Sequence, residues 1–255
     1  SEKLVSSQEL FAKLASMTGD ADARVRMQLA FSLGEFPPSE ARLAALQKIL
    51  GGYGQDRWIR TAVFSSLGTE AAAALKALAA DETMSPAAAF VALPELADLV
   101  ARRTGSEDGW KEMAAVVSQR SADPALQVKV LQAVYSANKA AQQSPAFAEL
   151  TTELISNART KAVDAELDEA VRGSALSALT LSTYAADGPL LLSSLDNTQP
   201  PGVQNAALAT LIRFSDDAIA TELLTRWPGL SPKLAERVRD GLLSRTSWSI
   251  VLLDA

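Results

Sequence analysis

In three similar segments of the chain an Asp stands four residues before an Arg: Asp22 and Arg26, Asp56 and Arg60, and Asp168 and Arg172. An Asp just ahead of a helix can cap its free N–H groups, whereas an Arg in the first turn is unfavourable for the helix dipole. We therefore predict an internal ladder, in which each Arg pairs with the Asp of its own copy or of the adjoining copy. The alternative is that these Arg side chains face a ligand.

The first two pairs lie in segments that copy one another. Residues 22–34 and 56–68 both contain a β-branched residue directly before the Arg and end in Leu-Gly, and Arg26 and Arg60 are 34 residues apart. A fixed period of about 20 to 50 residues is typical of a solenoid built from stacked repeats. Weaker copies follow at residues 85–94, 123–134, 168–179, 201–211 and 234–243. We predict that each copy is the second helix of a helix pair.

Two of the copies depart from the pattern. Residues 85–94 lack the Arg and contain Pro94, so we expect a bent or shortened helix there. In the next copy we align Lys129 with the Arg of the other copies. With this alignment, the connection from that copy to Arg172 is longer than the others.

Amphipathic segments between the copies are candidates for the first helix of each pair. Apolar residues recur at a helical period in residues 8–17, 41–50, 147–158 and 218–227, and Gly51-Gly52 is a typical signal for the end of a helix. No segment alternates at period two for long enough to indicate a strand. The predicted fold is all-α: a right-handed α-solenoid of about seven helix pairs, forming a single repeat domain over residues 1–255.

Composition narrows the possible partners. The chain is 48% hydrophobic and 21% charged, as in ordinary soluble globular proteins, and its net charge is −6. A protein that binds duplex nucleic acid generally carries a basic stripe, but here the basic residues are scattered and Arg102-Arg103 is the only adjacent pair. The most apolar stretch, near residues 190–195, is too short to cross a membrane. We expect neither nucleic-acid binding nor membrane insertion.

The chain contains no Cys and no His, which removes most catalytic chemistry. No thiolate nucleophile, imidazole base, haem ligand of the usual kind or Cys/His zinc site can be built. The glycine cluster at residues 51–54 matches neither the dinucleotide pattern nor the P-loop, and no Gly-x-Ser-x-Gly elbow is present. We predict that the protein is not an enzyme and has no catalytic residue, cofactor or metal.

Residues 25–35 and 56–66, and more loosely 244–255, resemble the HEAT-repeat (PBS-lyase HEAT-like) region of large exported proteins from planctomycetes and their relatives, of the membrane-bound dehydrogenase-like type. In that family, HEAT repeats join a dehydrogenase-like β-propeller to a cytochrome c-type haem domain. This chain has no Cys-x-x-Cys-His motif and no propeller. The resemblance thus implies the connecting scaffold alone, in an extracytoplasmic, periplasmic location. A first residue that is Ser and an abrupt C-terminal helix add the expectation of a domain excised from a longer protein.

The function we expect is a non-catalytic scaffold for a protein partner or for flanking domains of the same polypeptide, with an oligomeric state that the residues do not indicate. Trp and Arg dominate binding hot spots, so the candidate interaction surface is Arg24, Arg57, Trp58 and Arg60. Trp58 could instead be packed between repeats. The alternative function is a HEAT-like enzyme or enzyme subunit, such as a bilin-lyase-type protein, which would be marked by a carboxylate of raised pKa beside a Trp or Tyr.

Overall fold

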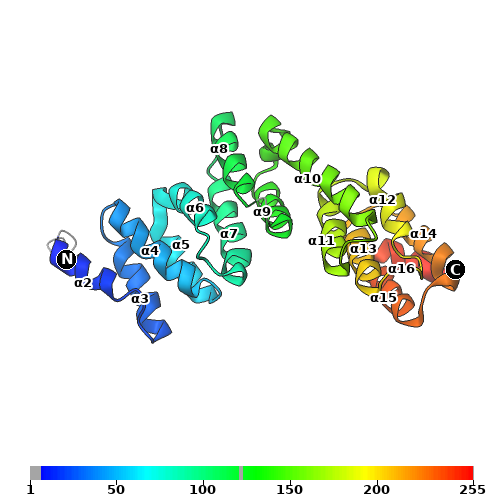
Figure 1. The fold of residues 1–255 in the computed structure, drawn as a ribbon, viewed down its shortest axis with the longest axis horizontal. Coiled ribbons are helices and arrows are strands. Elements are labelled where there is room, and N and C mark those ends of the chain that lie inside the picture. The colour runs from blue at the N-terminus through cyan, green and yellow to red at the C-terminus, as the bar shows by residue number, and fades with distance from the viewer. Residues whose placement is uncertain (1–6, 121–122, 255) are drawn as a thin grey trace. The chain divides into compact units, whose positions relative to one another are not determined.

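The computed structural model describes residues 7–120 and 123–254, and within these ranges it is helical, with no strand (Figure 1). First helices are α2 (Gln8–Ser16), α4 (Glu40–Tyr53), α6 (Ala71–Ala80), α8 (Glu107–Ser118), α10 (Pro145–Val163), α12 (Tyr184–Ser193), α14 (Ala218–Arg226) and α16 (Thr246–Leu253). Second helices are α3 (Ala23–Gly34), α5 (Arg57–Leu67), α7 (Pro86–Ala101), α9 (Pro124–Ala137), α11 (Glu169–Ala178), α13 (Pro201–Arg213) and α15 (Pro232–Leu243). Each predicted copy lies on one of these second helices. Ser1 and Ala255, the ends on which the expectation of an excised domain partly rests, lie outside the described residues.

The chain divides into two compact units, Ser1–Ala148 and Glu149–Ala255, and the boundary falls within helix α10. From the sequence alone, a single repeat domain over residues 1–255 is expected. In the first unit, α3 packs on α5 and α7 packs on α9, while α6 contacts both α4 and α8. In the second unit, α13 packs between α11 and α15, and α14 packs on α16. Helices of the same kind therefore stack within each unit, an arrangement compatible with an α-solenoid.

Short polar side chains start most of these helices. The carboxylates of Asp22, Asp56 and Asp123 accept hydrogen bonds from backbone N–H groups in the first turns of α3, α5 and α9, which confirms the capping role predicted for Asp22 and Asp56. Asp168 makes no such side-chain bond at the start of α11. The core between the helices consists mainly of Leu and Ala, and the small Ala side chains allow neighbouring helices to approach closely.

Two helices run past residues that were expected to end or shorten them. α7 continues through Pro94 for 16 residues, so the prediction of a shortened helix is wrong. Pro94 is buried, and α6 and α9 both pack on α7, so tertiary packing outweighs the hydrogen bond that the proline cannot donate. α4 likewise continues through Gly51 and Gly52 to Tyr53, with Gly54 as its C-cap.

The fourth residue of five second helices is a side-chain donor: Arg26, Arg60, Gln127, Arg172 and Gln204. Each donates to backbone carbonyl groups where the first helix of the same pair ends. The Arg60 Nη1 atom lies 2.9 Å from both the Gly54 and the Gln55 oxygen. The Gln127 amide lies 3.1 Å from the Val117 oxygen, and the Arg172 Nε atom lies 3.1 Å from the Ala162 oxygen. These donors satisfy carbonyl groups that no helix N–H can reach.

The predicted Asp–Arg ladder is therefore wrong in its partners. The carboxylate that pairs with Arg60 is Glu95 on α7, at 2.8 Å, and Arg172 donates to the Gln199 side chain at 2.6 Å. Arg26 donates to the Ala21 oxygen at 3.0 Å and lies over the Tyr53 ring. The capping Asp residues have extended backbones and turn their carboxylates toward their own helix N–H groups, so these carboxylates are already engaged.

In the copy at residues 123–134, the residue that corresponds to Arg60 lies two positions earlier than predicted. Gln127, and not Lys129, occupies the position of Arg60 in α9. Gln127 is buried, whereas the Lys129 ammonium lies over the Phe90 ring of α7. An amide can take the place of the guanidinium here because the shared task is to donate to a carbonyl group, which does not require a charge.

The ends of the second helices have donors of their own. Arg42 donates to the Ser66 oxygen at 2.9 Å, and Asn138 donates to the Ala101 oxygen at 3.0 Å. Arg245 donates to the Ile212 oxygen at 2.7 Å. In the third pair, where the fourth residue of α7 is an Ala, Arg120 donates to the Leu78 and Asp81 oxygens at the end of α6. Side chains from other elements thus close helix ends in both units.

We predict that Arg60→Ala lowers the free energy of unfolding by about 2–3 kcal/mol, because it leaves two loop carbonyls and Glu95 without their donor. Thermal or urea unfolding followed by circular dichroism measures this change. Arg24→Ala, which removes a side chain that is 89% exposed, is the matched control and should cost less than about 0.5 kcal/mol. Equal stability of the two variants would contradict a structural role for Arg60.

Candidate functional site

The four residues of the predicted interaction surface are found in two different environments. Arg24 is exposed at the start of α3 and pairs with Asp22 at 2.9 Å. Trp58 is 60% exposed at the start of α5, and the Arg57 guanidinium lies 4.7 Å from the centre of its ring. Trp58 is therefore not packed between neighbouring helices of its unit. Arg57 and Trp58 together form a cation–π pair on the surface.

Arg60 does not belong to this surface. Its side chain is buried, and its donors are directed to Glu95 and to the loop before α5. The ligand-facing alternative for Arg60 is therefore wrong. Arg172 is equally buried, in the second unit.

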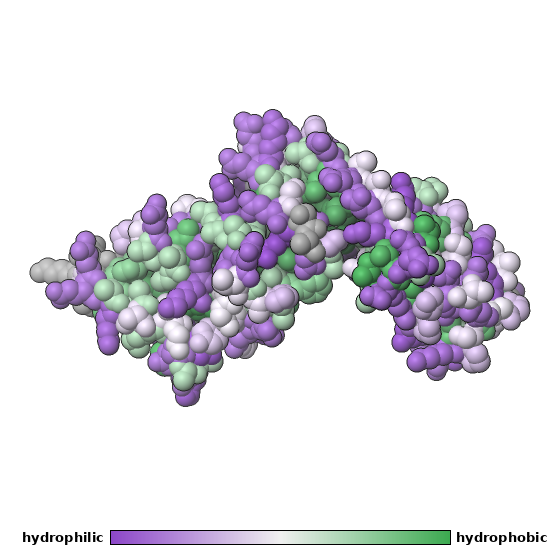
Figure 2. Space-filling view, in the orientation of Figure 1, coloured by the Kyte–Doolittle hydropathy of each residue, from purple (hydrophilic) through white to green (hydrophobic). Residues whose placement is uncertain are grey.

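Two further aromatic residues are exposed on second helices of the first unit. Phe31 on α3 and Phe90 on α7 are each 39% exposed, and Lys129 lies 4.0 Å from the centre of the Phe90 ring. We call Phe31, Trp58 and Phe90 the aromatic set. The helices that carry them are connected, because α3 packs on α5, and Arg60 of α5 is bonded to Glu95 of α7. Figure 2 shows hydrophobic residues interspersed with hydrophilic ones on the visible face of this unit.

Phe31 and Phe90 were not among the residues predicted for the interaction surface. Phe31 could have been found, because Arg24, Gln28 and Phe31 follow one another at helical spacing and are all exposed. Phe90 lies in the copy that lacks the Arg, where no residue of the repeat marks the exposed side of the helix. Of the other Trp residues, Trp110 and Trp248 are buried.

A carboxylate of raised pKa beside a Trp or Tyr was the feature that would mark the enzyme alternative. Asp187 on α12 is 2% exposed and pairs with Arg159 on α10 at 2.7 Å. Burial alone would raise the pKa of Asp187, but hydrogen bonds from Arg159 and Ser182, together with the charge of Arg159, outweigh it and hold this pKa below the ordinary value. A carboxyl group with a lowered pKa is a poor general acid at neutral pH. Asp187 stabilises the second unit as a charged partner.

No metal-binding cluster accompanies it in the described part of the chain. There, no group of three or more His, Cys, Asp or Glu residues is placed so that it could hold a metal ion. The helices described are all too short or too polar to cross a membrane. No protein-family model matches the chain, and neither a curated protein nor a solved structure matches it.

We predict that the second unit loses stability as the pH falls below about 4. The folded-state pKa of Asp187 is lowered, so its contribution is complete above the pKa of the unfolded chain and is lost as the pH falls through the folded-state value. Asp187→Asn should lower stability at pH 7 and flatten this pH dependence, as measured by urea unfolding between pH 2.5 and 7. Asp196→Asn, which changes a neighbouring exposed carboxylate, is the control. A pH profile that is unchanged in Asp187→Asn would contradict the assignment.

Proposed function

We propose that this chain is a non-catalytic interaction scaffold: a right-handed α-solenoid of HEAT-like helix pairs whose second helices bind a protein partner or a flanking domain. The observation that carries the proposal is Trp58, which is 60% exposed beside the Arg57 guanidinium. Exposure of a large aromatic ring to water costs free energy. This free energy is recovered when a partner covers the ring. Covering on the order of 100 Å² of such a ring is worth roughly 2–3 kcal/mol.

The surroundings of Trp58 support a pre-organised contact. Its backbone N–H donates to the Asp56 carboxylate at 2.8 Å, which fixes the start of α5. Arg60, two residues further on, holds the preceding loop through the Gly54 and Gln55 carbonyls. A binding residue held on a rigid helix end loses little conformational entropy when a partner docks.

The partner that this surface suits carries an apolar side chain next to an acidic one. An apolar group can cover the Trp58 ring while a carboxylate pairs with Arg57, and the same combination fits Phe90 and Lys129. Phe31 adds a third aromatic contact on α3. Aromatic residues and Arg are enriched at the centres of protein interfaces, whereas nucleic-acid surfaces require clustered cations.

The resemblance of residues 25–35 and 56–66 to planctomycete HEAT-repeat regions supports a place for the scaffold within a larger exported protein. In that setting it links a dehydrogenase-like propeller to a cytochrome c domain outside the cytoplasm. The absence of Cys and His from the whole sequence supports a connecting role over a redox role for these residues.

The test is a capture experiment with the chain as bait and extract of its source organism, followed by measurement of the affinity of the purified partner. Trp58→Ala and Arg57→Ala should each weaken the affinity at least tenfold, because hot-spot residues cost about 1.4 kcal/mol or more when truncated. Lys76→Ala, which changes an exposed cation on α6, should bind like the parent chain. Partners that bind all three variants equally, or an extract from which nothing is captured, would contradict the proposed surface.

A further inference from the structure

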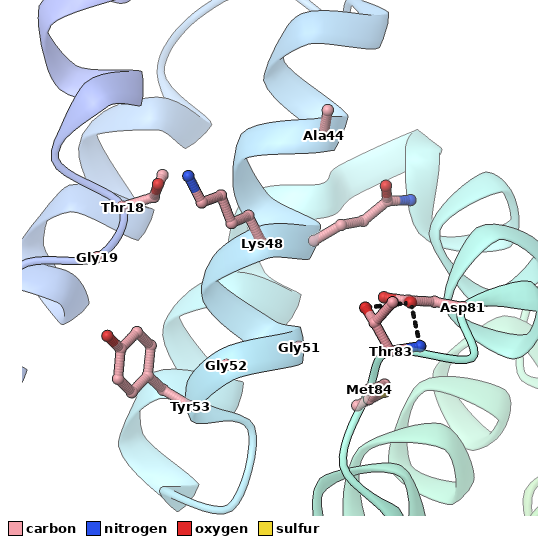
Figure 3. Close-up of a pocket in the computed structure, with 11 residues that line it drawn as sticks. Thr18, Gly19, Ala44, Lys48, Gly51, Gly52, Tyr53, Asp81, Thr83 and Met84 are labelled. Atoms are coloured by element: carbon pink, nitrogen blue, oxygen red, sulfur yellow. Dashed lines mark hydrogen bonds between the residues drawn. The ribbon is translucent and has the colours of Figure 1, made fainter.

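A pocket of about 570 Å³ lies across the last turns of helix α4. Ala44, Gly51 and Gly52 contribute helix backbone and small side chains to it, and Figure 3 shows the two glycines between its two sides. The loop after α2, with Thr18 and Gly19, lies on one side of α4, and the loop after α6 lies on the other. A Cβ atom added to Gly52 would have no heavy atom within 4 Å, so the helix backbone is open at this point.

The two sides of this pocket carry opposite charges. Figure 3 shows the Lys48 side chain directed toward the side of Thr18 and Tyr53, and Asp81 and Thr83 on the opposite side. Among the described residues, neither Lys48 nor Asp81 belongs to a salt bridge. The pocket thus has a positive end and a negative end with glycine backbone between them.

The carboxylate of Asp81 is fixed in place. Its Oδ1 atom accepts hydrogen bonds from the Thr83 N–H at 2.8 Å and from the Thr83 hydroxyl at 2.6 Å, and these bonds lower the pKa of Asp81. Its Oδ2 atom faces the backbone of Gly51, 3.8 Å from the position that a Cβ there would occupy. The charge is therefore present at neutral pH and one oxygen is turned toward the pocket floor.

Gln47 adds a donor with no acceptor. Its side-chain nitrogen is enclosed by protein and makes no hydrogen bond to any residue that the structure describes. An enclosed amide donor without an acceptor costs about 1–3 kcal/mol. Gln47 lines the pocket, so a rotation of its amide toward the pocket lets a carbonyl oxygen of an occupant remove this cost.

We propose that this pocket binds a short polypeptide segment of a partner protein, which crosses α4 over Gly51 and Gly52 with an acidic residue toward Lys48 and a basic residue toward Asp81. A main-chain carbonyl of the segment accepts from Gln47 once its amide has turned into the pocket. Charge complementarity favours a peptide over a neutral saccharide, because a saccharide leaves both charges unpaired. The open glycine floor permits the close approach that an extended main chain requires. The site shares no residue with the aromatic set and goes beyond the scaffold function proposed above.

The experiment uses the full chain with ¹⁵N-labelled glycine, so that Gly19, Gly51 and Gly52 report on the pocket, and Gly173 in the second unit reports on nonspecific effects. The probes are blocked hexapeptides with one Glu and one Arg in either order, separated by two to four Gly or Ala residues. An all-neutral hexapeptide and maltohexaose serve as comparison probes. We expect saturable shifts of the Gly51 and Gly52 amides with at least one charged peptide, no shift of Gly173, and binding at least tenfold weaker for both comparison probes.

Two variants link such shifts to the proposed contacts. Gly52→Leu fills the floor and improves helix propensity, so it should abolish binding without loss of stability, whereas Ala73→Leu on the exposed side of α6 should bind normally. Lys48→Glu should weaken binding of the charged peptide at least tenfold. The proposal is overturned if no charged peptide shifts the pocket glycines at millimolar concentration, if Gly52→Leu binds like the parent chain, or if maltohexaose binds as well as the peptides.

Discussion

Backbone carbonyl groups at the ends of helices are the constraint on which the rest of this structure depends. The last four carbonyl groups of a helix have no intrahelical donor, and a chain of short stacked helices has such ends throughout its interior. Here the donors are long side chains of other elements. Arg60, Gln127, Arg172 and Gln204 close the ends of first helices, and Arg42, Asn138 and Arg245 close the ends of second helices. Stacking of the helices and closure of their ends therefore form together.

This constraint also determines what reaches the surface. Because Arg60 is anchored to the loop before α5, the first turn of that helix is held in place, and the Trp58 ring beside Arg57 is left exposed. One helix pair earlier, Arg26 lies over the Tyr53 ring, so the last residue of α4 is held close to the pocket that Gly51 and Gly52 line. The same kind of side chain thus supports two separate surfaces of the first unit, although none of these Arg residues needs to touch a partner.

Much of the fold could be predicted from the residues, because a repeat displays its own period. The spacing of Arg26 and Arg60 and the apolar period of residues 41–50 locate helix pairs directly. The partners of the Arg side chains could not be predicted, since Glu95 lies 35 positions after Arg60 and has no fixed spacing in the other copies. Gln127 was not predicted because the copies were aligned by their charged residues. A neutral amide can donate the same hydrogen bond to a carbonyl group without carrying a charge. For the surface, Trp58 and Arg57 could be predicted from residue type. The burial of Arg60 and the exposure of Phe31 and Phe90 depend on packing.

The most direct test of this account is the stability of Gln127→Leu, because it removes a buried donor but keeps the volume and adds apolar character. Urea unfolding of the first unit can be followed through Trp110, which is buried against Phe147 in that unit. A loss of about 0.5–1.5 kcal/mol is expected, since the Val117 carbonyl loses the Gln127 amide and keeps only the Arg120 backbone N–H as donor. Gln28→Leu, at an exposed position of α3, should be close to neutral. If Gln127→Leu is as stable as the parent chain or more stable, then closure of the helix ends by side-chain donors is not what holds the fold together.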